Sequence, residues 1–136
     1  MQRRLKRHLK SGWKLWIVAL PVILAAAVAW ERVSAQQEEL DPVKIAPDVQ
    51  KVVFENALVR VTEERMPPGR GVRKHRHMHG LTIALADYQM EQKLYPSGQV
   101  IHSNRHFGEI NWTETFIHEA RNEGTTNQYV VRIELK

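Results

Sequence analysis

The sequence predicts an all-β domain built as a sandwich or a barrel, and three observations lead to this fold class. Apolar and polar residues alternate in short runs through most of the chain after residue 48, which is the pattern of strands with one buried face. Turn sequences rich in glycine, proline and asparagine separate these runs at intervals of roughly 8 to 12 residues. No window after residue 36 repeats its apolar residues with the period of a helix. A chain of 136 residues is long enough for one such domain and too short for two.

The expected strands follow one another with recognisable turns between them. Residues 67–71, PPGRG, form a turn, because proline presets one backbone angle and glycine accepts a positive φ. The sequence YPSGQ at 95–99 is typical of a hairpin turn between two short strands. The other strands are expected at residues 51–56, 58–66, 81–91, 107–112, 115–120 and 128–135.

The alternation also predicts a core made of the apolar residues of these strands. If Leu81, Ile83 and Leu85 fill the barrel, no room is left in it for a ligand. The core candidates are Val53, Leu58, Val61, Leu81, Ile83, Leu85, Ile110, Trp112, Phe116, Val130, Val131 and Ile133.

Residues 1–35 have the order of a secretory signal. A basic stretch, MQRRLKRHLKSGWK, precedes the sixteen residues 15–30, which carry no charge, and Val33-Ser34-Ala35 has the pattern of a cleavage site. An uncleaved membrane anchor is the alternative, but sixteen residues are short against the roughly 20 that cross a bilayer, and Pro21 interrupts them. In either case the remainder is exported. We therefore expect a periplasmic protein, or one tethered by residues 15–30 and facing the periplasm.

The rest of the chain divides into a linker and a domain of balanced charge. Residues 36–47 are polar, contain two prolines and are expected to be a linker or arm, which leaves 48–136 for the β domain. Of the 20 Lys and Arg residues, seven lie in residues 1–35 beside one acidic residue, so the remainder holds 13 basic and 14 acidic residues. The basicity therefore belongs to the leader, and no nucleic-acid partner is expected. The absence of cysteine excludes disulfides, thiolate catalysis and sulfur-ligated metals.

Three of the seven histidines lie within five residues, in RKHRHMHGL at 73–81. In a strand, residues two apart point to the same face, so His75, His77 and His79 share one face. Two alternate imidazoles can converge on one ion, whereas the outer pair is too far apart, so a third ligand must come from a distant strand. His118 is the first candidate for it, and His102 and His106 are others.

Two motifs place these histidines in a known context. In PGRGVRKHRH, Gly69 is followed by five residues and then by His75 and His77. In GEINWTETFIHEARNEG, a second glycine precedes His118 and Asn122. In order and spacing the two motifs resemble those of small single-domain cupins, over roughly residues 44–136. The resemblance implies a jelly-roll barrel that holds one divalent transition metal (Fe, Mn, Zn or Ni) on His75, His77 and His118. It also implies a homodimer that pairs through its sheets.

The sequence departs from the cupin pattern at two places. The first motif normally continues three or four residues later with a glutamate ligand, where this chain has Leu81 and Thr82. His79 or a water molecule is the expected replacement. The second motif normally carries a proline and a glycine ahead of its histidine, where this chain has Glu114 and Phe116. These departures put catalysis of the family type in question more than the fold.

Three functions are consistent with this sequence. The first is an enzyme that acts on a small molecule through a metal with open coordination positions, which can act as a Lewis acid or activate water or dioxygen. The second is a non-catalytic small-molecule-binding module. The third is a membrane-tethered interaction module with a degenerate cupin site. The chain contains no GxSxG, P-loop or dinucleotide-binding motif.

Overall fold

The structure, a computed structural model, describes Arg32 and residues 39–136. The expected signal or anchor, including the apolar stretch 15–30, lies outside the described residues apart from Arg32. Among the residues that are described, no helix is long and apolar enough to cross a membrane.

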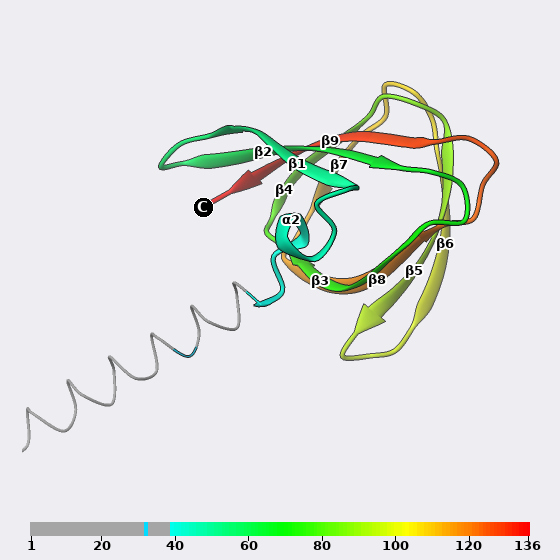
Figure 1. Ribbon diagram of the computed structural model, residues 1–136, viewed down its shortest axis with the longest axis horizontal. Coiled ribbons are helices and arrows are strands. Elements are labelled where there is room, and N and C mark those ends of the chain that lie inside the picture. The colour runs from blue at the N-terminus through cyan, green and yellow to red at the C-terminus, as the bar shows by residue number, and fades with distance from the viewer. Residues whose placement is uncertain (1–31, 33–38) are drawn as a thin grey trace, which may run out of the picture. The chain divides into compact units, whose positions relative to one another are not determined.

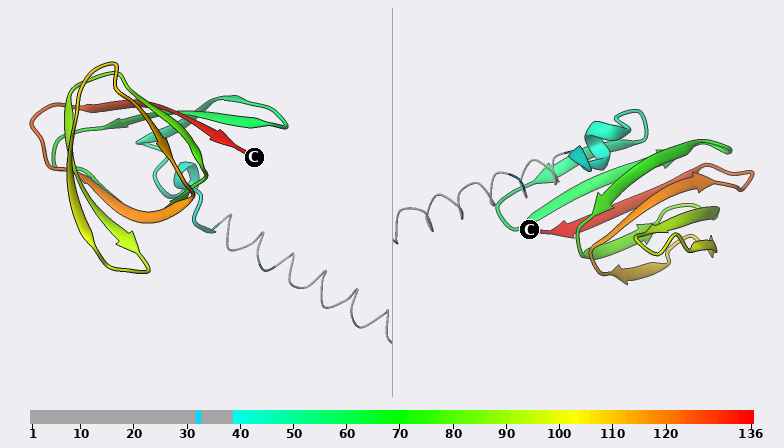
Figure 2. Two further views of the ribbon diagram at one scale, coloured as in Figure 1. Left: turned by 180° about the vertical axis from the view of Figure 1, so that it is seen from behind. Right: turned by 90° about the horizontal axis from the view of Figure 1, so that it is seen from below.

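Within residues 39–136, nine strands form two sheets that face each other across a common interior, as a jelly roll (Figures 1 and 2). The five-stranded sheet has the order β1-β2-β9-β4-β7 and the four-stranded sheet the order β3-β8-β5-β6. All pairings are antiparallel. The elements in chain order are α2 (Pro42–Ile45), β1 (Gln50–Glu55), β2 (Val59–Met66), β3 (Gly71–His77), β4 (Gly80–Ala84), β5 (Tyr88–Tyr95), β6 (Val100–Arg105), β7 (Ile110–Thr113), β8 (Phe116–Asn122) and β9 (Gln128–Leu135).

The all-β prediction is confirmed, although two of the expected runs differ from the strands in the structure. The run at 107–112 forms a strand only at β7, Ile110–Thr113. The run expected as a strand at 81–91 is divided between β4 and β5 by residues 85–87. The two strands belong to different sheets, so the chain must turn between them. Asp87 holds that turn: its carboxylate accepts the backbone N–H of Phe107, and its carbonyl accepts the hydroxyl of Thr126.

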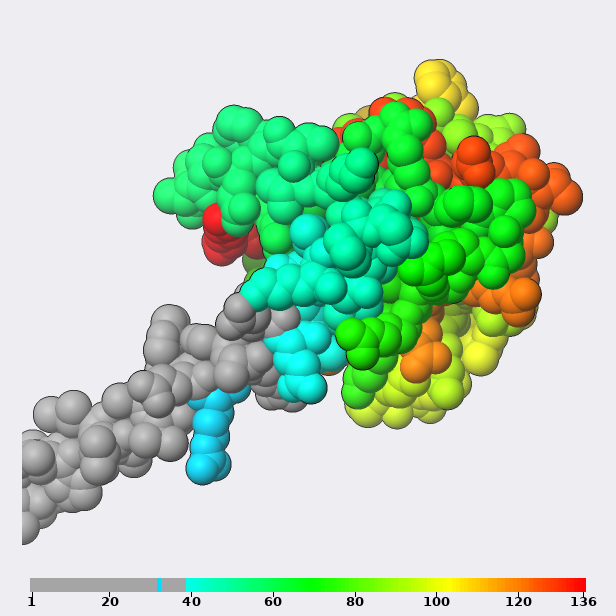
Figure 3. Space-filling model, viewed as in Figure 1, coloured from blue at the N-terminus to red at the C-terminus, as the bar shows by residue number. Residues whose placement is uncertain are grey.

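The segment expected as a linker contributes to the packing of the domain. Asp41 caps α2 by accepting the N–H of Val43, and the N–H of Arg76 in β3 donates to the carbonyl of Leu40. Figure 3 shows the α2 segment, in cyan, lying against the green strands. The small apolar core cluster consists of Ala46, Val49, Met66, Val72, Met90 and Ala120.

The predicted core was largely wrong, because most of the strand faces that we expected to be buried point outward, and the opposite faces point into the barrel. Of the twelve candidates, Val130 alone is buried, while Val53, Leu58, Ile110 and Trp112 are more than half exposed. The inward positions of β9 carry Gln128, Arg132 and Glu134 as well as Val130. Alternation shows that one face differs from the other, but it does not say which face is inside. In this barrel the polar face is inside and surrounds a site.

The outward residues of the five-stranded sheet form an apolar row across all its strands. Phe54 is the cross-strand partner of Val61, Val61 of Ile133, Ile133 of Leu81, and Leu81 of Trp112. We call these five residues the outer apolar row. Phe54 and Trp112, at the two ends of the row, are exposed, while the three residues between them are half-buried. Apolar rows that reach the surface in this way are typical of interaction surfaces.

Candidate metal centre

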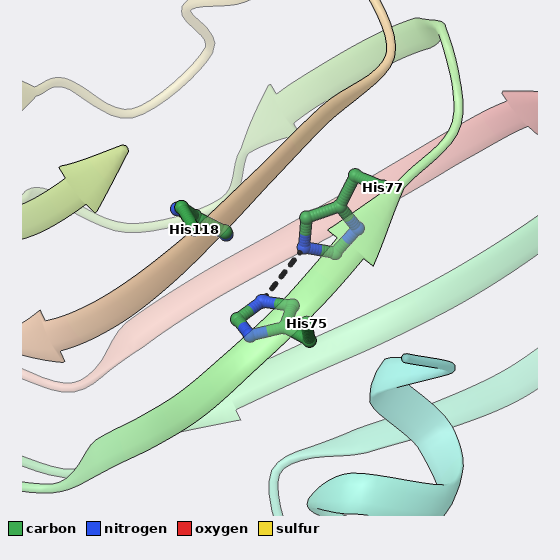
Figure 4. A group of neighbouring side chains, drawn as sticks. All are labelled: His75, His77 and His118. Atoms are coloured by element: carbon green, nitrogen blue, oxygen red, sulfur yellow. Dashed lines mark hydrogen bonds between the residues drawn. The ribbon is translucent and has the colours of Figure 1, made fainter. Parts of the chain in front are cut away.

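The two motifs bring three histidines together inside the barrel. His75 and His77 lie on β3, and His118 is the direct cross-strand partner of His75 on β8. The pairing of β3 with β8 is irregular between Val72 and His75, which is consistent with both histidines pointing inward. The three side chains are 1%, 1% and 3% exposed, and one nitrogen of each lies within 4.8 Å of the others. Figure 4 shows the group, with His75 and His77 directed toward each other.

The carboxylate of Glu134 fixes the orientation and the tautomer of His77. Glu134 Oε1 lies 2.9 Å from His77 Nδ1 and also accepts the backbone N–H of Met78 at 3.2 Å. An ionised carboxylate can only accept hydrogen bonds, so beside it His77 Nδ1 is the ring nitrogen that carries the proton. In a neutral imidazole the other nitrogen, here Nε2, is then unprotonated and carries a free lone pair. A carboxylate behind an imidazole in this manner is typical of metal sites.

His75 is held in the same tautomer by the backbone. Its Nδ1 lies 2.8 Å from the carbonyl oxygen of Arg73, which can only accept. Both imidazoles therefore present unprotonated Nε2 atoms, and these atoms are 3.1 Å apart, the contact drawn as a dashed line in Figure 4. Two lone pairs cannot bond to each other. Nitrogens that share an ion at about 2.0–2.1 Å lie roughly 2.9 to 3.4 Å apart for octahedral to tetrahedral angles, so the spacing fits a shared metal.

His118 completes the group without any hydrogen bond of its own. Neither of its ring nitrogens has a partner within the described part of the chain, although both are buried. Its ring centroid lies 4.4 Å from that of His75 and 5.3 Å from that of His77. A buried imidazole with both nitrogens unsatisfied is costly. Binding of a metal ion by one of these nitrogens reduces this free-energy cost, because that nitrogen then has a partner.

Burial keeps all three imidazoles in the form that binds a metal. Desolvation lowers the pKa of His75, although the carbonyl of Arg73 opposes it. Desolvation and then the nearby Arg132 guanidinium lower the pKa of His77 well below its ordinary value. Desolvation, together with His77 and His75, also lowers the pKa of His118 strongly. A lowered pKa favours the neutral imidazole, which is the ligand form.

The other histidines of residues 39–136 do not join this group. His79 follows the end of β3, and its ring lies beside that of Trp112, with centroids 6.0 Å apart. It therefore does not take the place of the missing glutamate ligand. His102 is exposed and contacts Glu123 through Nδ1 at 2.9 Å. His106 is exposed and lies 3.8 Å from a carboxylate oxygen of Asp87.

The four residues at which the motifs depart from the cupin pattern lie partly inside the barrel and partly on its surface. Leu81 belongs to the outer apolar row, while Thr82 lines the interior cavity and directs its hydroxyl to the carbonyl of Asn111. Thr82 therefore stands on the side where a glutamate ligand would lie. Phe116 packs inside, with ring centroids 4.7 Å from His118 and 5.5 Å from His77. Glu114 is on the surface, where it accepts the indole N–H of Trp112.

Asn122, the last residue of the second motif, supports the fold. Its side-chain amide is buried and donates to the carbonyls of Met66 and Thr126, while its oxygen accepts the N–H of Gly124. These bonds join the end of β2 to the turn before β9. Asn122 therefore fixes the strands around the site and is not part of the histidine group.

The sequence analysis missed the charged residues of β9 and β2. Arg132 and Glu64 form a buried ion pair with a distance of 2.7 Å between Arg132 Nε and Glu64 Oε1. Burial raises the pKa of Glu64, but the Arg132 guanidinium, the main group that opposes this effect, brings the net pKa below its ordinary value. Burial raises the pKa of Glu134. A signal did exist: QYVVRIEL has polar residues at every second position except Val130, and that polar face is the one inside.

The solved structures that this chain is similar to include cupin-domain proteins. A cupin domain from Bordetella pertussis Tohama I has a TM-score of 0.59 and 29% sequence identity, over 65% of this chain and 92% of that chain. A cupin-superfamily protein from Desulfitobacterium hafniense DCB-2 has a TM-score of 0.49 at 13% identity, over 64% and 75% of the two chains. A Klebsiella pneumoniae protein with a double-stranded β-helix domain has a TM-score of 0.49 at 24% identity, over 62% and 73%. No protein-family model and no curated protein matches the sequence.

The fold is therefore the cupin jelly roll that the two motifs imply. The structure also confirms that His75, His77 and His118 lie together inside it. Three neutral nitrogen ligands, one of them oriented by a carboxylate, form a set that suits several divalent transition metals.

Proposed function

We propose that the barrel binds one divalent transition metal through His75, His77 and His118 and uses it to bind a small molecule. The observation that carries this proposal is the convergence of the Nε2 atoms of His75 and His77 at 3.1 Å in tautomers that leave both atoms unprotonated. The unsatisfied nitrogens of His118 support it independently. With a divalent ion such as zinc, iron, manganese or nickel bound, the site would supply Lewis acidity and activate water, and a redox-active ion such as iron would also activate dioxygen.

The chain's own residues prepare the site for that role. Glu134 and the Arg73 carbonyl hold the rings of His77 and His75, and Phe116 packs against two of the three imidazoles. These contacts exclude water from the back of the site. The three protein nitrogens leave open positions for a ligand in any geometry with four or more bonds. Enzymatic activity on that ligand is the function we propose for this site.

Calorimetric titration of chelator-treated full-length protein with Co²⁺ and Zn²⁺ tests the metal proposal. We expect one ion per chain, and no uptake by the His75→Ala/His118→Ala variant. The pKa values of the three imidazoles are lowered, so protons compete with the metal only at a lower pH than usual. The affinity at pH 6.0 is therefore expected to stay within about fivefold of that at pH 7.5, whereas three ordinary histidines would lose roughly 50-fold.

The matched control for this titration is His102→Ala, which changes an exposed histidine in the second group of potential ligands, Glu91, His102 and Glu123. We expect its stoichiometry and affinity to equal those of the unchanged protein. Uptake that survives in the double variant but is lost in His102→Ala contradicts the proposal, as does a folded protein that takes up neither ion.

We further propose that two copies of the chain pair through the outer apolar row. An apolar sheet face can be covered by the same face of a second copy, and two-fold dimers are the commonest assemblies of this kind. Lys51 and Glu63, cross-strand partners on the same face, provide a polar edge. Sedimentation analysis is expected to show a dimer, and Ile133→Glu, at the centre of the row, is expected to shift it to monomer. Val100→Glu, at an exposed position of β6, is the control; a monomeric unchanged protein contradicts this proposal.

We also propose, on the pattern of residues 1–35 alone, that the domain works outside the cytoplasm. Expression of the full chain in a Gram-negative host, followed by fractionation and intact-mass measurement, checks this. We expect periplasmic protein that begins at Gln36, because Ala35 ends the cleavage site. Protein with its leader intact in the membrane fraction would indicate the anchor instead. Full-length protein in the cytoplasm contradicts export.

A further inference from the structure

The interior cavity beside the histidines contains a cation, Arg132, with a donor that no residue in the described part of the chain uses. The Arg132 side chain is 9% exposed, and its Nε donates to Glu64. Its Nη1 is buried and has no hydrogen-bond partner among the described residues. Arginine cannot give up its proton in a protein, so this donor stays charged and unsatisfied. Such a group is costly in a folded protein unless a ligand completes it.

The same cavity holds further unsatisfied polar atoms of the opposite kind. Gln128 Oε1 and Gln50 Oε1 are buried acceptors without a partner in residues 39–136, and the Thr113 hydroxyl is also unpaired. All three residues line the cavity together with Arg132 and the three histidines. A ligand that satisfies the whole set carries an anionic acceptor for Arg132 and at least one hydroxyl, amine or amide donor for the glutamine oxygens.

The charges around the cavity also favour an anion. Among the described residues that line it, Glu64 is the one carboxylate, and Arg132 already pairs with it. Arg105 also lines the cavity and is paired with Glu109. The three imidazoles are neutral, so a divalent ion bound to them introduces two positive charges that no protein ligand balances. This step rests on the proposed function, whereas the unsatisfied Arg132 donor does not.

The size of the cavity limits the ligand to a small molecule. Its volume is about 90 Å³, and one water-sized probe takes roughly 10–15 Å³ on this scale. The space therefore accepts about six to nine non-hydrogen atoms. A nucleotide, a sugar phosphate or a peptide is too large to be enclosed.

We propose that the barrel binds a small organic carboxylate that bears a hydrogen-bond donor. Its carboxylate accepts from Arg132 Nη1, and its donor group reaches the amide oxygen of Gln128 or Gln50. In the metal-loaded protein the ligand lies beside the histidine group and supplies negative charge there.

Carboxylates measured beside their neutral amides test this assignment without changing the protein. The probes are acetate and acetamide, lactate and lactamide, and benzoate and benzamide, titrated against chelator-treated and Zn²⁺-loaded full-length protein and followed by ligand-observed NMR. We expect lactate, which has the hydroxyl donor and fits the volume, to bind about tenfold or more tightly than lactamide in both forms. Acetate lacks the donor and is expected to bind more weakly than lactate.

Variants then test whether the preference for lactate over lactamide depends on Arg132. Arg132→Lys keeps a cation beside Glu64 but removes Nη1, so the preference for lactate over lactamide is expected to disappear. Because this variant can lose stability, its fold is checked by circular dichroism, and Gln128→Leu provides a second test that removes an acceptor and leaves Arg132 in place. Gln128→Leu, or its combination with Gln50→Leu where Gln50 accepts the donor, is expected to bring lactate affinity down to that of acetate.

The possible results separate this inference from the metal proposal. Lactate binding that depends on Arg132 in a protein without metal uptake would support the carboxylate site and contradict the metal site. Metal uptake with no carboxylate favoured over its amide overturns the inference alone. Arg132-dependent binding of chloride or inorganic phosphate, with carboxylates no better than their amides, overturns it as well.

Discussion

Replacing His118 with leucine is expected to stabilise the metal-free protein by about 1–3 kcal/mol and to abolish metal binding. The imidazole of His118 is buried with both nitrogens unsatisfied, and a buried polar group without partners costs about that much. Leucine has a similar volume and no polar atom. The measurement is the free energy of unfolding in urea with a chelator present. A residue kept at the expense of stability is expected at a functional site and not in a structural core.

The matched control for this experiment is His77→Leu. His77 donates to Glu134, which is itself 5% exposed, so its removal leaves a buried carboxylate with the Met78 N–H as its remaining partner among the described residues. We expect His77→Leu to destabilise the metal-free protein. If His118→Leu destabilised the protein by as much as His77→Leu, His118 would support the fold. One of the two arguments for the metal site would then be lost.

Replacing Glu64 with glutamine is expected to destabilise the protein by about 3–5 kcal/mol. Glu64 and Arg132 are 5% and 9% exposed at their side chains, and breaking a buried ion pair leaves an uncompensated charge. The charge that remains is a guanidinium, which cannot be neutralised by losing a proton. The lowered pKa of Glu64 means that its contribution is present at neutral pH and is lost as the pH falls through that folded-state pKa.

Two further variants serve as a comparison and a control for Glu64→Gln. The double variant Glu64→Gln/Arg132→Gln removes both charges and is expected to recover much of the loss, since no buried charge is left unpaired. Asp48→Asn breaks the exposed pair with Arg70, whose side chains are 61% and 40% exposed, and is expected to change stability little. Urea unfolding at pH 7 measures all three. A Glu64→Gln effect as small as that of Asp48→Asn would contradict a buried pair.

Much of the fold was predictable because strands of this domain have a clear period and clear turns. The strands β1, β2, β8 and β9 lie within a residue or two of the expected ranges. The division of 81–91 into β4 and β5 was not predictable, because a change of sheet leaves no mark on the alternation. The assignment of faces failed for the same reason. A period of two is unchanged when inside and outside are exchanged, and Leu81, Ile83 and Ile110 cover the outside.

The histidine group was predictable from motif order, whereas its supporting residues were not. The spacing of Gly69, His75 and His77, followed by His118, is a local feature of the sequence. Glu134 lies 57 residues beyond His77, and Arg132 lies 68 residues beyond Glu64. Nothing in a single sequence joins residues this far apart until the strand order is known.

A crystal structure of the Zn²⁺-loaded full-length protein, with anomalous differences recorded at the zinc edge, tests the central claim most directly. The account predicts one anomalous peak per chain, about 2.0–2.1 Å from one nitrogen of each of His75, His77 and His118. His75 and His77 are expected to bind through Nε2, because Nδ1 of each is already engaged. A peak at Glu91, His102 and Glu123 alone, or a histidine group that remains free of zinc in loaded crystals, would contradict it.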